Sequence, residues 1–120
     1  MERYFLDTYA LIEIIEGNEK FKDFLDCEIV ISINNLVEFD YYLLRTGNKN
    51  REYYRKFFYS FCIEILLEDI SKANELKLKN KKLSYTDCLG YIIAKRLRIK
   101  FVTGDEGFRN FKGIRFIKKS

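Results

Sequence analysis

The chain has 120 residues, of which 48% are hydrophobic and 33% are charged, a balance typical of one folded domain and not of a disordered segment. Lys and Arg outnumber Asp and Glu by 22 to 18, which gives a formal net charge of +4. There is no histidine, and this excludes Ser–His and Cys–His nucleophile pairs, a histidine general base and histidine-bound zinc.

No apolar run approaches the ~20 residues that span a bilayer, and the first apolar stretch is too short for a signal peptide. We therefore expect a single domain over residues 1–120, no membrane segment and a cytoplasmic location. The three cysteines Cys27, Cys62 and Cys88 are widely spaced and form no metal-ligand pattern. We expect them to be small buried hydrophobic side chains in a reducing compartment.

Strands alternate with helices in the predicted order of elements. The first helix has Leu11 and Ile14 on one face and Gly17 at its end, and residues 29–33 form a β-branched run typical of a buried parallel strand. The expected elements are, in chain order, a strand at 3–6, helices at 8–16 and 19–26, a strand at 29–33, helices at 34–46 and 51–60, a strand at 62–66, helices at 69–79 and 84–97, and strands at 101–103 and 114–117.

Two of these segments carry a more specific expectation. In the short helix at 19–26 we expect Phe21, Phe24 and Leu25 to face inward. Residues 62–66 suit an edge strand or a continuation of the preceding helix, and we favour the strand. The alternation as a whole predicts an α/β fold of three layers, with a mainly parallel central sheet of four to five strands and helices on both faces.

Four acidic residues fall at the ends of predicted strands or the starts of predicted helices: Asp7, Glu38, Asp87 and Asp105. In an open α/β sheet such ends meet at one edge, where ligands bind. Two carboxylates ~5 Å apart repel by roughly 3 kcal/mol at an effective dielectric near 20, so their convergence requires a cation or protonation. Without histidine the site has only oxygen ligands, which suits Mg²⁺ or Mn²⁺ and the hydrolysis of a phosphodiester.

Each acid also has a structural explanation. Asp7 could cap the following helix, Asp87 could complete a capping box, and Asp105 could initiate a turn. Glu38 could be a solvated helix residue, with Asp40 as a competing acid. These explanations account for the acids one at a time, whereas a metal site accounts for all four together.

Four motifs along essentially the whole chain carry a resemblance to a known family. They are Phe5-Leu6-Asp7-Thr8, Ile31-Ser32-Ile33-Asn34-Asn35-Leu36-Val37-Glu38, Thr86-Asp87-Cys88-Leu89-Gly90-Tyr91-Ile92-Ile93-Ala94 and Val102-Thr103-Gly104-Asp105-Glu106-Gly107-Phe108. In this order and spacing the chain resembles PIN-domain nucleases, and within them the small VapC-type toxins. The resemblance implies a PIN-like fold and an endoribonuclease in which Asp7, Glu38, Asp87 and Asp105 are catalytic and bind Mg²⁺ or Mn²⁺.

The same resemblance implies supporting hydroxyls at Thr8 and Thr103, an RNA substrate, an antitoxin partner and a homodimer. Two positions depart from the family pattern. Asn35 stands where a hydroxyl residue is common, which alters hydrogen bonding around the site. Gly107 stands where some members have a further acid; the neighbouring Glu106 could compensate for it, but we expect Glu106 to face solvent.

Two other functions stay open: a stand-alone PIN-like nuclease of RNA processing, and a non-catalytic RNA- or protein-binding domain with the same fold. The aromatic residues between 39 and 61 suit a half-buried core or a groove for an amphipathic helix. Basic clusters at 79–82, 95–98 and 112–119 are ordinary solvated positions, except that any cluster beside the acids would attract RNA phosphates.

Overall fold

The computed structural model describes residues 2–118; residue 1 and residues 119–120, with the end of the basic cluster at 112–119, lie outside the described residues. No helix in the described part of the chain is both long and apolar enough to cross a bilayer. The elements are, in chain order, β1 (Arg3–Leu6), α1 (Thr8–Ile15), the 3-10 helix η1 (Glu19–Asp26), β2 (Glu28–Val30), α2 (Ile33–Arg45), α3 (Arg51–Tyr59), α4 (Leu67–Lys79), α5 (Tyr85–Leu97), β3 (Lys100–Thr103), the 3-10 helix η2 (Glu106–Phe108) and β4 (Ile114–Phe116).

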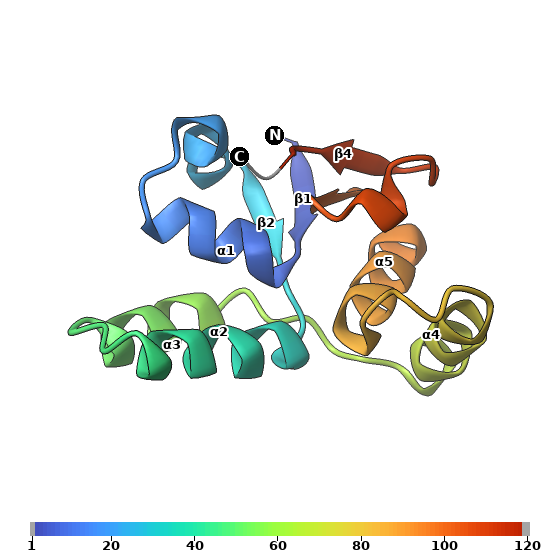
Figure 1. The fold of residues 1–120 in the computed structure, drawn as a ribbon, viewed down its shortest axis with the longest axis horizontal. Helices are drawn as coiled ribbons and strands as arrows, with labels where there is room; N and C mark the ends of the chain where they lie inside the picture. Colours follow the sequence, from blue (N-terminus) through green and yellow to red (C-terminus); the bar gives the residue numbers. More distant parts are fainter. Residues whose placement is uncertain (1, 119–120) are drawn as a thin grey trace.

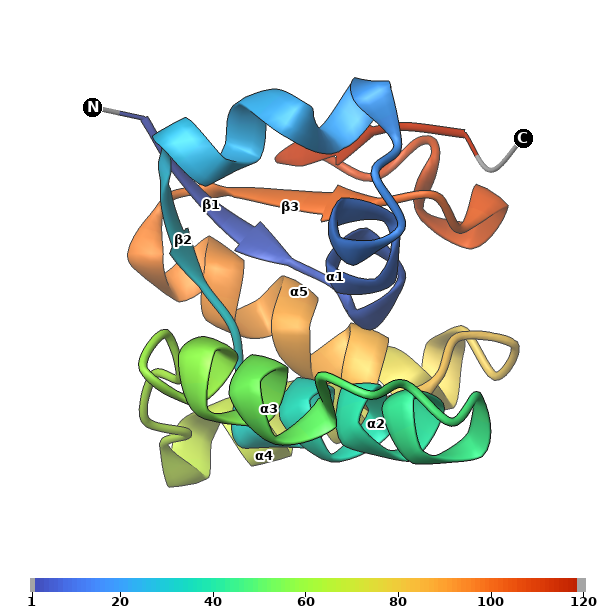
Figure 2. The same ribbon diagram turned by 90° about the vertical axis from the view of Figure 1, so that its left-hand side faces the viewer.

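The central sheet has four strands in the order β2–β1–β3–β4, and all three pairings are parallel. Figures 1 and 2 show α1 and η1 on one face of the sheet and α5 on the other, with α2 and α3 packed side by side beyond α1 and α4 beside α5. The predicted α/β fold, with helices on both faces of a mainly parallel sheet of four to five strands, is confirmed. Parallel strands end at the same edge, so the residues that follow them are brought together.

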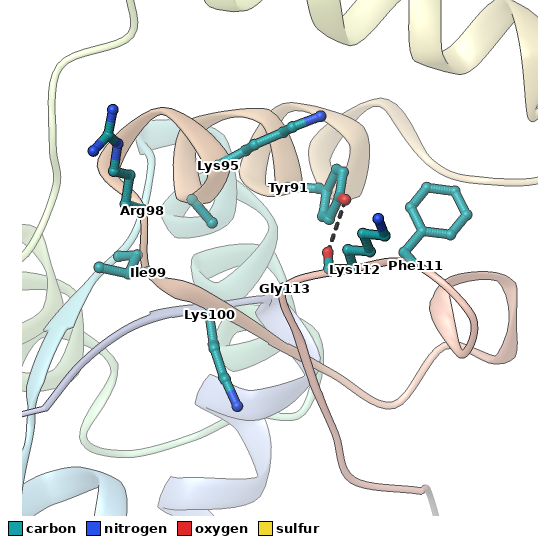
Figure 3. A pocket seen from close by; sticks show the side chains of 9 residues that line it. Tyr91, Lys95, Arg98, Ile99, Lys100, Phe111, Lys112 and Gly113 are labelled. Carbon is teal, nitrogen blue, oxygen red and sulfur yellow. Dashed lines mark hydrogen bonds between the residues drawn. The ribbon is translucent and has the colours of Figure 1, made fainter.

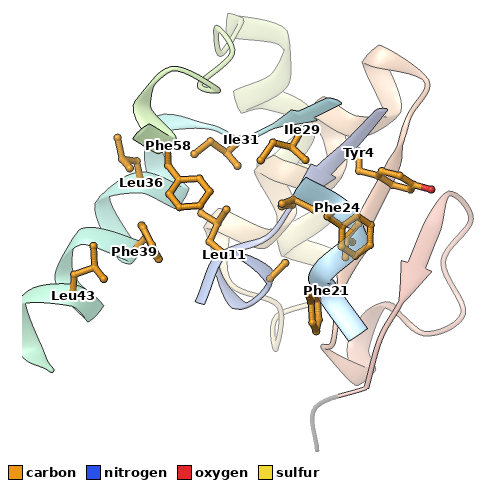
Figure 4. Close-up of a cluster of buried hydrophobic side chains, with 13 residues drawn as sticks. Tyr4, Leu11, Phe21, Phe24, Ile29, Ile31, Leu36, Phe39, Leu43 and Phe58 are labelled. Carbon is orange, nitrogen blue, oxygen red and sulfur yellow. The ribbon is translucent and has the colours of Figure 1, made fainter. Parts of the chain in front are cut away.

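Neighbouring residues of β1 supply two different cores. Tyr4 and Leu6 pack with α1, η1 and α2 in the cluster of Figure 4, whereas Phe5 packs with α5. This follows from the two-residue period of a strand, which points successive side chains to opposite faces. A continuous apolar strand therefore suits a sheet covered on both sides.

Helix α5 lies unusually close to the sheet at Gly90. A Cβ atom at this position would lie 2.7 Å from Cε1 of Phe5 and 2.9 Å from Cε1 of Phe101. The glycine in the middle of a helix, unfavourable by propensity, is thus explained by the packing of α5 on β1 and β3. This packing also sets the position of Asp87, one turn earlier in α5.

Strand β2 is shorter than the predicted strand at 29–33, because α2 begins at Ile33. The Ser32 hydroxyl accepts the N–H of Asn35 at 3.3 Å, and the Asn35 side-chain oxygen accepts the N–H of Ser32 at 3.0 Å. This reciprocal capping box ends the strand and starts the helix despite the β-branched residues around it.

The predicted strand at 62–66 is wrong. Ile31 N–H donates to the Phe61 carbonyl at 3.1 Å and Ile63 N–H to the Ile31 carbonyl at 2.8 Å, which makes one isolated bridge between Ile31 and Cys62. Because the chain turns into α2 directly after Ile31, no further strand residue is left for this segment to pair with.

Phe21 and Phe24 of η1 are buried as predicted, but Leu25 is 55% exposed, so its inward orientation is wrong. In a 3-10 helix residues three apart share a face, which aligns Phe21 with Phe24 and leaves Leu25 outside. Of the cysteines, Cys88 is buried and Cys27 and Cys62 are half-buried, all as free thiols.

Candidate functional site

Asp7 lies where β1 ends and α1 begins. Its backbone N–H donates to the Val102 carbonyl of β3 at 3.1 Å, and its Oδ1 accepts the N–H of Ala10 at 2.8 Å. The side chain is the N-cap of α1, and the residue is only 3% exposed. The cap confirms the structural explanation for Asp7 and holds its carboxylate beside the end of β3.

Glu38 is exposed on the first half of α2 and is held by a chain of polar side chains that begins in the interior. Thr8 Oγ1 donates to Glu38 Oε1 at 2.6 Å, and Asn35 Nδ2 donates to Thr8 Oγ1 at 3.2 Å. Asn35 is fully buried, and its Oδ1 also accepts the Ser32 hydroxyl at 2.8 Å. We call this sequence of bonds, Ser32–Asn35–Thr8–Glu38, the polar chain.

Thr8 thus contacts a predicted site acid directly, as expected of a supporting hydroxyl. The importance of Asn35 was missed in the sequence, where it counted only as a departure from a family pattern. The spacing of three residues between Ser32 and Asn35 is that of a capping box, and this signal could have placed its amide at the start of α2.

Asp105 lies in the turn that follows β3. Its N–H donates to Thr103 Oγ1 at 3.1 Å, and its Oδ1 accepts the N–H of Gly107 at 2.9 Å. A Cβ on Gly104 would lie 2.6 Å from Cε2 of Tyr9, so the turn packs directly on α1. Thr103 therefore positions the Asp105 backbone, in contrast to Thr8, which bonds a site carboxylate.

Asp87 is half-buried in the first turn of α5, where its N–H donates to Ser84 Oγ at 3.0 Å. Only two residues separate the end of α5 from β3, so the helix runs back along the sheet and its first turn lies near the ends of the strands. A Cβ on Gly107 would lie 2.6 Å from Cδ2 of Leu83. The segment that leads into α5 therefore touches the Asp105 turn.

These contacts place all four predicted acids at the carboxyl edge of the sheet. Asp7 joins β3 through Val102, Glu38 joins α1 through Thr8, and the turns before Asp87 and after Asp105 touch. Among residues 2–118, however, no three His, Cys, Asp or Glu side chains are grouped so that they could hold a metal ion. Asp7, Glu38 and Asp105 each direct a carboxylate oxygen into a bond within the chain, and binding of a metal by the four acids stays a prediction.

The competing acids are neutralised by arginine. Asp40 accepts Nε and Nη2 of Arg51 at 2.9 and 2.8 Å, and these hydrogen bonds hold the pKa of Asp40 below its ordinary value. Glu106 is exposed and pairs with Arg109 at 2.7 Å. Glu38 and Asp105, in contrast, form no salt bridge with any residue between 2 and 118.

A third acid, Asp69, is 2% exposed at the start of α4. It accepts Nε and Nη2 of Arg96 at 3.0 and 2.9 Å and also caps α4 through the N–H of Leu66. Its charge is therefore compensated within the fold. The arginine partners of Asp40, Glu106 and Asp69 thus distinguish these three acids from Glu38 and Asp105 at the carboxyl edge.

Of the predicted basic clusters, the one at 79–82 borders this edge. A cavity of about 490 Å³ is lined by residues 78–83 together with Gly107. Lys118 lines a second hollow with Gly104, Asp105 and Glu106. The cluster at 95–98 lies at the opposite end of α5, away from Asp87.

Comparison with known proteins yields one family and a set of related folds. The model of the PIN domain family matches residues 4–114 of the chain. No curated protein matches the sequence significantly.

Two solved structures resemble the chain over almost its whole length. A toxin–antitoxin complex from Klebsiella pneumoniae has a TM-score of 0.79 at 20% identity, covering 97% of this chain and 99% of that one. VapBC2 from Rickettsia felis, bound to a DNA fragment from its promoter, has a TM-score of 0.74 at 17% identity, covering 98% of this chain and 99% of that one. At these identities the likeness concerns the fold.

Proposed function

The chain belongs to the PIN domain family, and we propose that it is a divalent-metal-dependent endoribonuclease that hydrolyses RNA phosphodiester bonds, the toxin of a type II toxin–antitoxin pair acting in the cytoplasm. One observation carries the proposal. In a chain of this family, four acids from separate parts of the chain lie at the carboxyl edge of the sheet, and Thr8 joins one of them, Glu38, to α1, the helix capped by Asp7.

Asp7, Glu38, Asp87 and Asp105 would hold Mg²⁺ or Mn²⁺, because they form an all-oxygen donor set in a chain without histidine. When bound, the ion supplies Lewis-acid stabilisation of the charge that develops on the scissile phosphate. The protein positions the acids that would hold the ion. The cap keeps the buried Asp7 at the end of β1, the polar chain holds Glu38, and Thr103 holds the backbone of Asp105.

Positive charge borders these acids on two sides. Lys81 and Lys82 belong to the segment that packs near Gly107, and Lys118 lies by Asp105. Ammonium groups beside an acidic site attract the phosphates of an RNA strand and offset the repulsion that the acids exert on it.

The proposal is tested with purified protein and a fluorescent single-stranded RNA. We expect cleavage with Mn²⁺ or Mg²⁺, none after chelation with EDTA, and a loss of at least 100-fold in Asp105→Asn. Glu106→Gln is the matched control, because it removes the adjacent carboxylate, which is exposed and paired with Arg109. Cleavage that survives both chelation and Asp105→Asn contradicts the proposal.

An exposed apolar stripe on α2 supports the antitoxin partner. Ile33, Val37, Tyr41 and Leu44 are 42%, 65%, 64% and 56% exposed and recur at the spacing of one helix face. Contiguous exposed apolar side chains mark protein-binding surfaces. Two similar solved structures are a toxin–antitoxin complex and VapBC2 bound to promoter DNA.

Co-expression tests the partner. We expect the product of a small adjacent gene to co-purify with the wild-type chain and to inhibit cleavage, and Val37→Lys with Tyr41→Lys to abolish both effects without loss of nuclease activity. Active nuclease with no such inhibitor in any neighbouring gene would favour the stand-alone RNA-processing enzyme. RNA binding without cleavage would favour the non-catalytic domain. A homodimer, also expected, is tested by the mass of the purified chain in solution.

A further inference from the structure

Another cavity lies at the end of α5 that is remote from Asp87. Its volume is about 480 Å³, within the usual range of small-ligand sites. Tyr91, Ile99 and Phe111 provide an apolar lining, and Lys95, Arg98 and Lys112 provide positive charge. Among residues 2–118, no acidic side chain lines it. We call this cavity, defined by these six residues, the distal basic pocket.

Figure 3 shows how the charged groups are placed. Lys95 and Lys112 extend on either side of Tyr91, whose hydroxyl donates to the Lys112 carbonyl at 2.8 Å. That bond joins α5 to the turn before β4 and stabilises the pocket wall. Lys100 contributes its backbone, because its ammonium group points away from α5. The positive charge of the pocket therefore comes from Lys95, Arg98 and Lys112.

The backbone conformation of Arg98 is one that glycine usually adopts, so a cationic side chain is unexpected at this position. Arg98 has φ 59° and ψ 41°, and it is the one non-glycine residue between 2 and 118 with a positive φ. Its N–H bonds the Lys95 carbonyl at 3.1 Å and the Ile99 N–H bonds the Ala94 carbonyl at 3.0 Å. This is the Schellman geometry, in which glycine is the usual residue. A position that favours glycine thus carries one of the three cationic groups of the pocket.

Cationic groups beside aromatic side chains form the combination that binds single-stranded nucleic acid, where phosphates meet Lys or Arg and bases meet aromatic surface. Acidic peptides would use the charge but have no planar base for the aromatic lining. We propose that the distal basic pocket binds a nucleotide unit of single-stranded RNA outside the cleavage site. The choice of RNA among polyanions rests on the proposed function.

The separation from the acids follows from the length of α5. The helix has 13 residues between the turns that hold the two sites, and at 1.5 Å per residue it extends about 20 Å. A strand held in the distal basic pocket is therefore bound at a point away from the carboxyl edge. A second contact of this kind raises the affinity for an RNA long enough to reach both sites, compared with a shorter RNA. It adds no group at the reaction centre.

Binding is measured by fluorescence anisotropy of a labelled 12-nucleotide RNA in EDTA, which prevents cleavage. We expect Lys95→Gln combined with Lys112→Gln to weaken binding at least tenfold near 0.1 M salt. Each lost phosphate contact lowers the slope of log K against log salt by about 0.7, so the double variant lowers it by about 1.4. The matched control is Lys20→Gln with Lys22→Gln, two exposed lysines of η1 on the other face of the sheet, for which we expect less than a twofold change.

Two further measurements identify the ligand. Adenosine monophosphate should displace the RNA in the wild type, and an Asp/Glu-rich peptide of equal charge should not. Arg98→Gly should weaken RNA binding about threefold while raising the melting temperature, since glycine suits the left-handed backbone.

Equal binding by the Lys95/Lys112 and Lys20/Lys22 variants overturns the inference, as does capture of the acidic peptide in preference to RNA. If the pocket variants bind normally while the wild type still cleaves RNA with Mn²⁺, only the distal site is refuted. If the pocket binds RNA but no metal-dependent cleavage occurs, the proposed function fails and the RNA site stands.

Discussion

Thr8 Oγ1 lies 2.6 Å from Glu38 Oε1, a contact between residues 30 positions apart that joins α1 to α2. The same hydroxyl accepts a hydrogen bond from the buried Asn35 amide at 3.2 Å. Thr8 therefore donates to a carboxylate and accepts from an amide at once. This single side chain holds the exposed Glu38 beside the start of α1, which Asp7 caps.

Replacement of Thr8 by valine should separate this role from packing. Thr8→Val leaves the Asn35 amide unpaired in a buried position, which costs about 1–3 kcal/mol in the free energy of unfolding. Loss of a positioning contact should also lower RNA cleavage about 10–100-fold. Thr8→Ser keeps the hydroxyl and should restore most of both. Equal activity of the Val and Ser variants, measured by denaturation and cleavage assays, would refute a positioning role.

Substitutions at Asp7 should distinguish its cap from its charge. Asn is as good an N-cap as Asp, whereas Ala loses about 1 kcal/mol, so Asp7→Ala should be less stable than Asp7→Asn. Without metal, Asp7→Asn should melt above the wild type, because one of several nearby negative charges is removed. Mn²⁺ should raise the melting temperature of the wild type, since it binds only the folded state, and should have little effect on either variant. An undiminished response in Asp7→Asn would count against the metal site.

In Gly90→Ala, helix propensity and side-chain packing have opposite effects on stability. Alanine is favoured over glycine in a helix by about 1 kcal/mol. The added Cβ would lie 2.7 Å from Phe5 and 2.9 Å from Phe101, and such overpacking costs about 1–3 kcal/mol. We expect packing to dominate and the variant to be about 1 kcal/mol less stable in chemical denaturation. A variant that is more stable than the wild type would show that α5 can move away from the sheet.

The Asp40–Arg51 pair should make stability depend on acid pH. Because hydrogen bonds from Arg51 lower the pKa of Asp40 in the folded state, the pair stabilises fully above the unfolded Asp pKa of about 3.9. The contribution is lost as the pH falls below that value through the lower folded pKa. The pair is partly exposed, so we expect about 1 kcal/mol or less. Unfolding measured from pH 7 to 3 should show a smaller decline in Asp40→Asn; parallel curves for the two proteins would refute this.

The aromatic residues of α2 and α3 show how much of their burial could be predicted from the local sequence. The crowding of rings between residues 39 and 61 predicted either core or surface, and both occur. Phe39 and Phe58 are buried and pack edge to face with centroids 5.1 Å apart, while Tyr41 and Tyr53 are 64% and 65% exposed. Composition indicates that rings are numerous, but the helix face on which each one falls decides its burial.

The errors have a common cause. The strand predicted at 62–66 has the right residues but only Ile31 to pair with, and Leu25 is apolar but lies off the face shared by Phe21 and Phe24. In each case the local sequence favoured one structure, but the elements that pack around the segment determined another. Hydrophobicity predicts that a segment tends toward burial, whereas partners and helix geometry decide which of its residues are buried.

The amino-acid sequence by itself determined the α/β alternation, the positions of the four acids near the ends of strands and the starts of helices, and the absence of histidine. These properties depend on residue type and on spacing along the chain. Only the tertiary structure decided that Asp40 pairs with Arg51, that Thr8 and Asn35 hold Glu38, and that the basic cluster at 79–82 borders the acids while that at 95–98 lies at the far end of α5. Such contacts join side chains from separate elements, and they exist only after the two cores have packed the helices against the sheet.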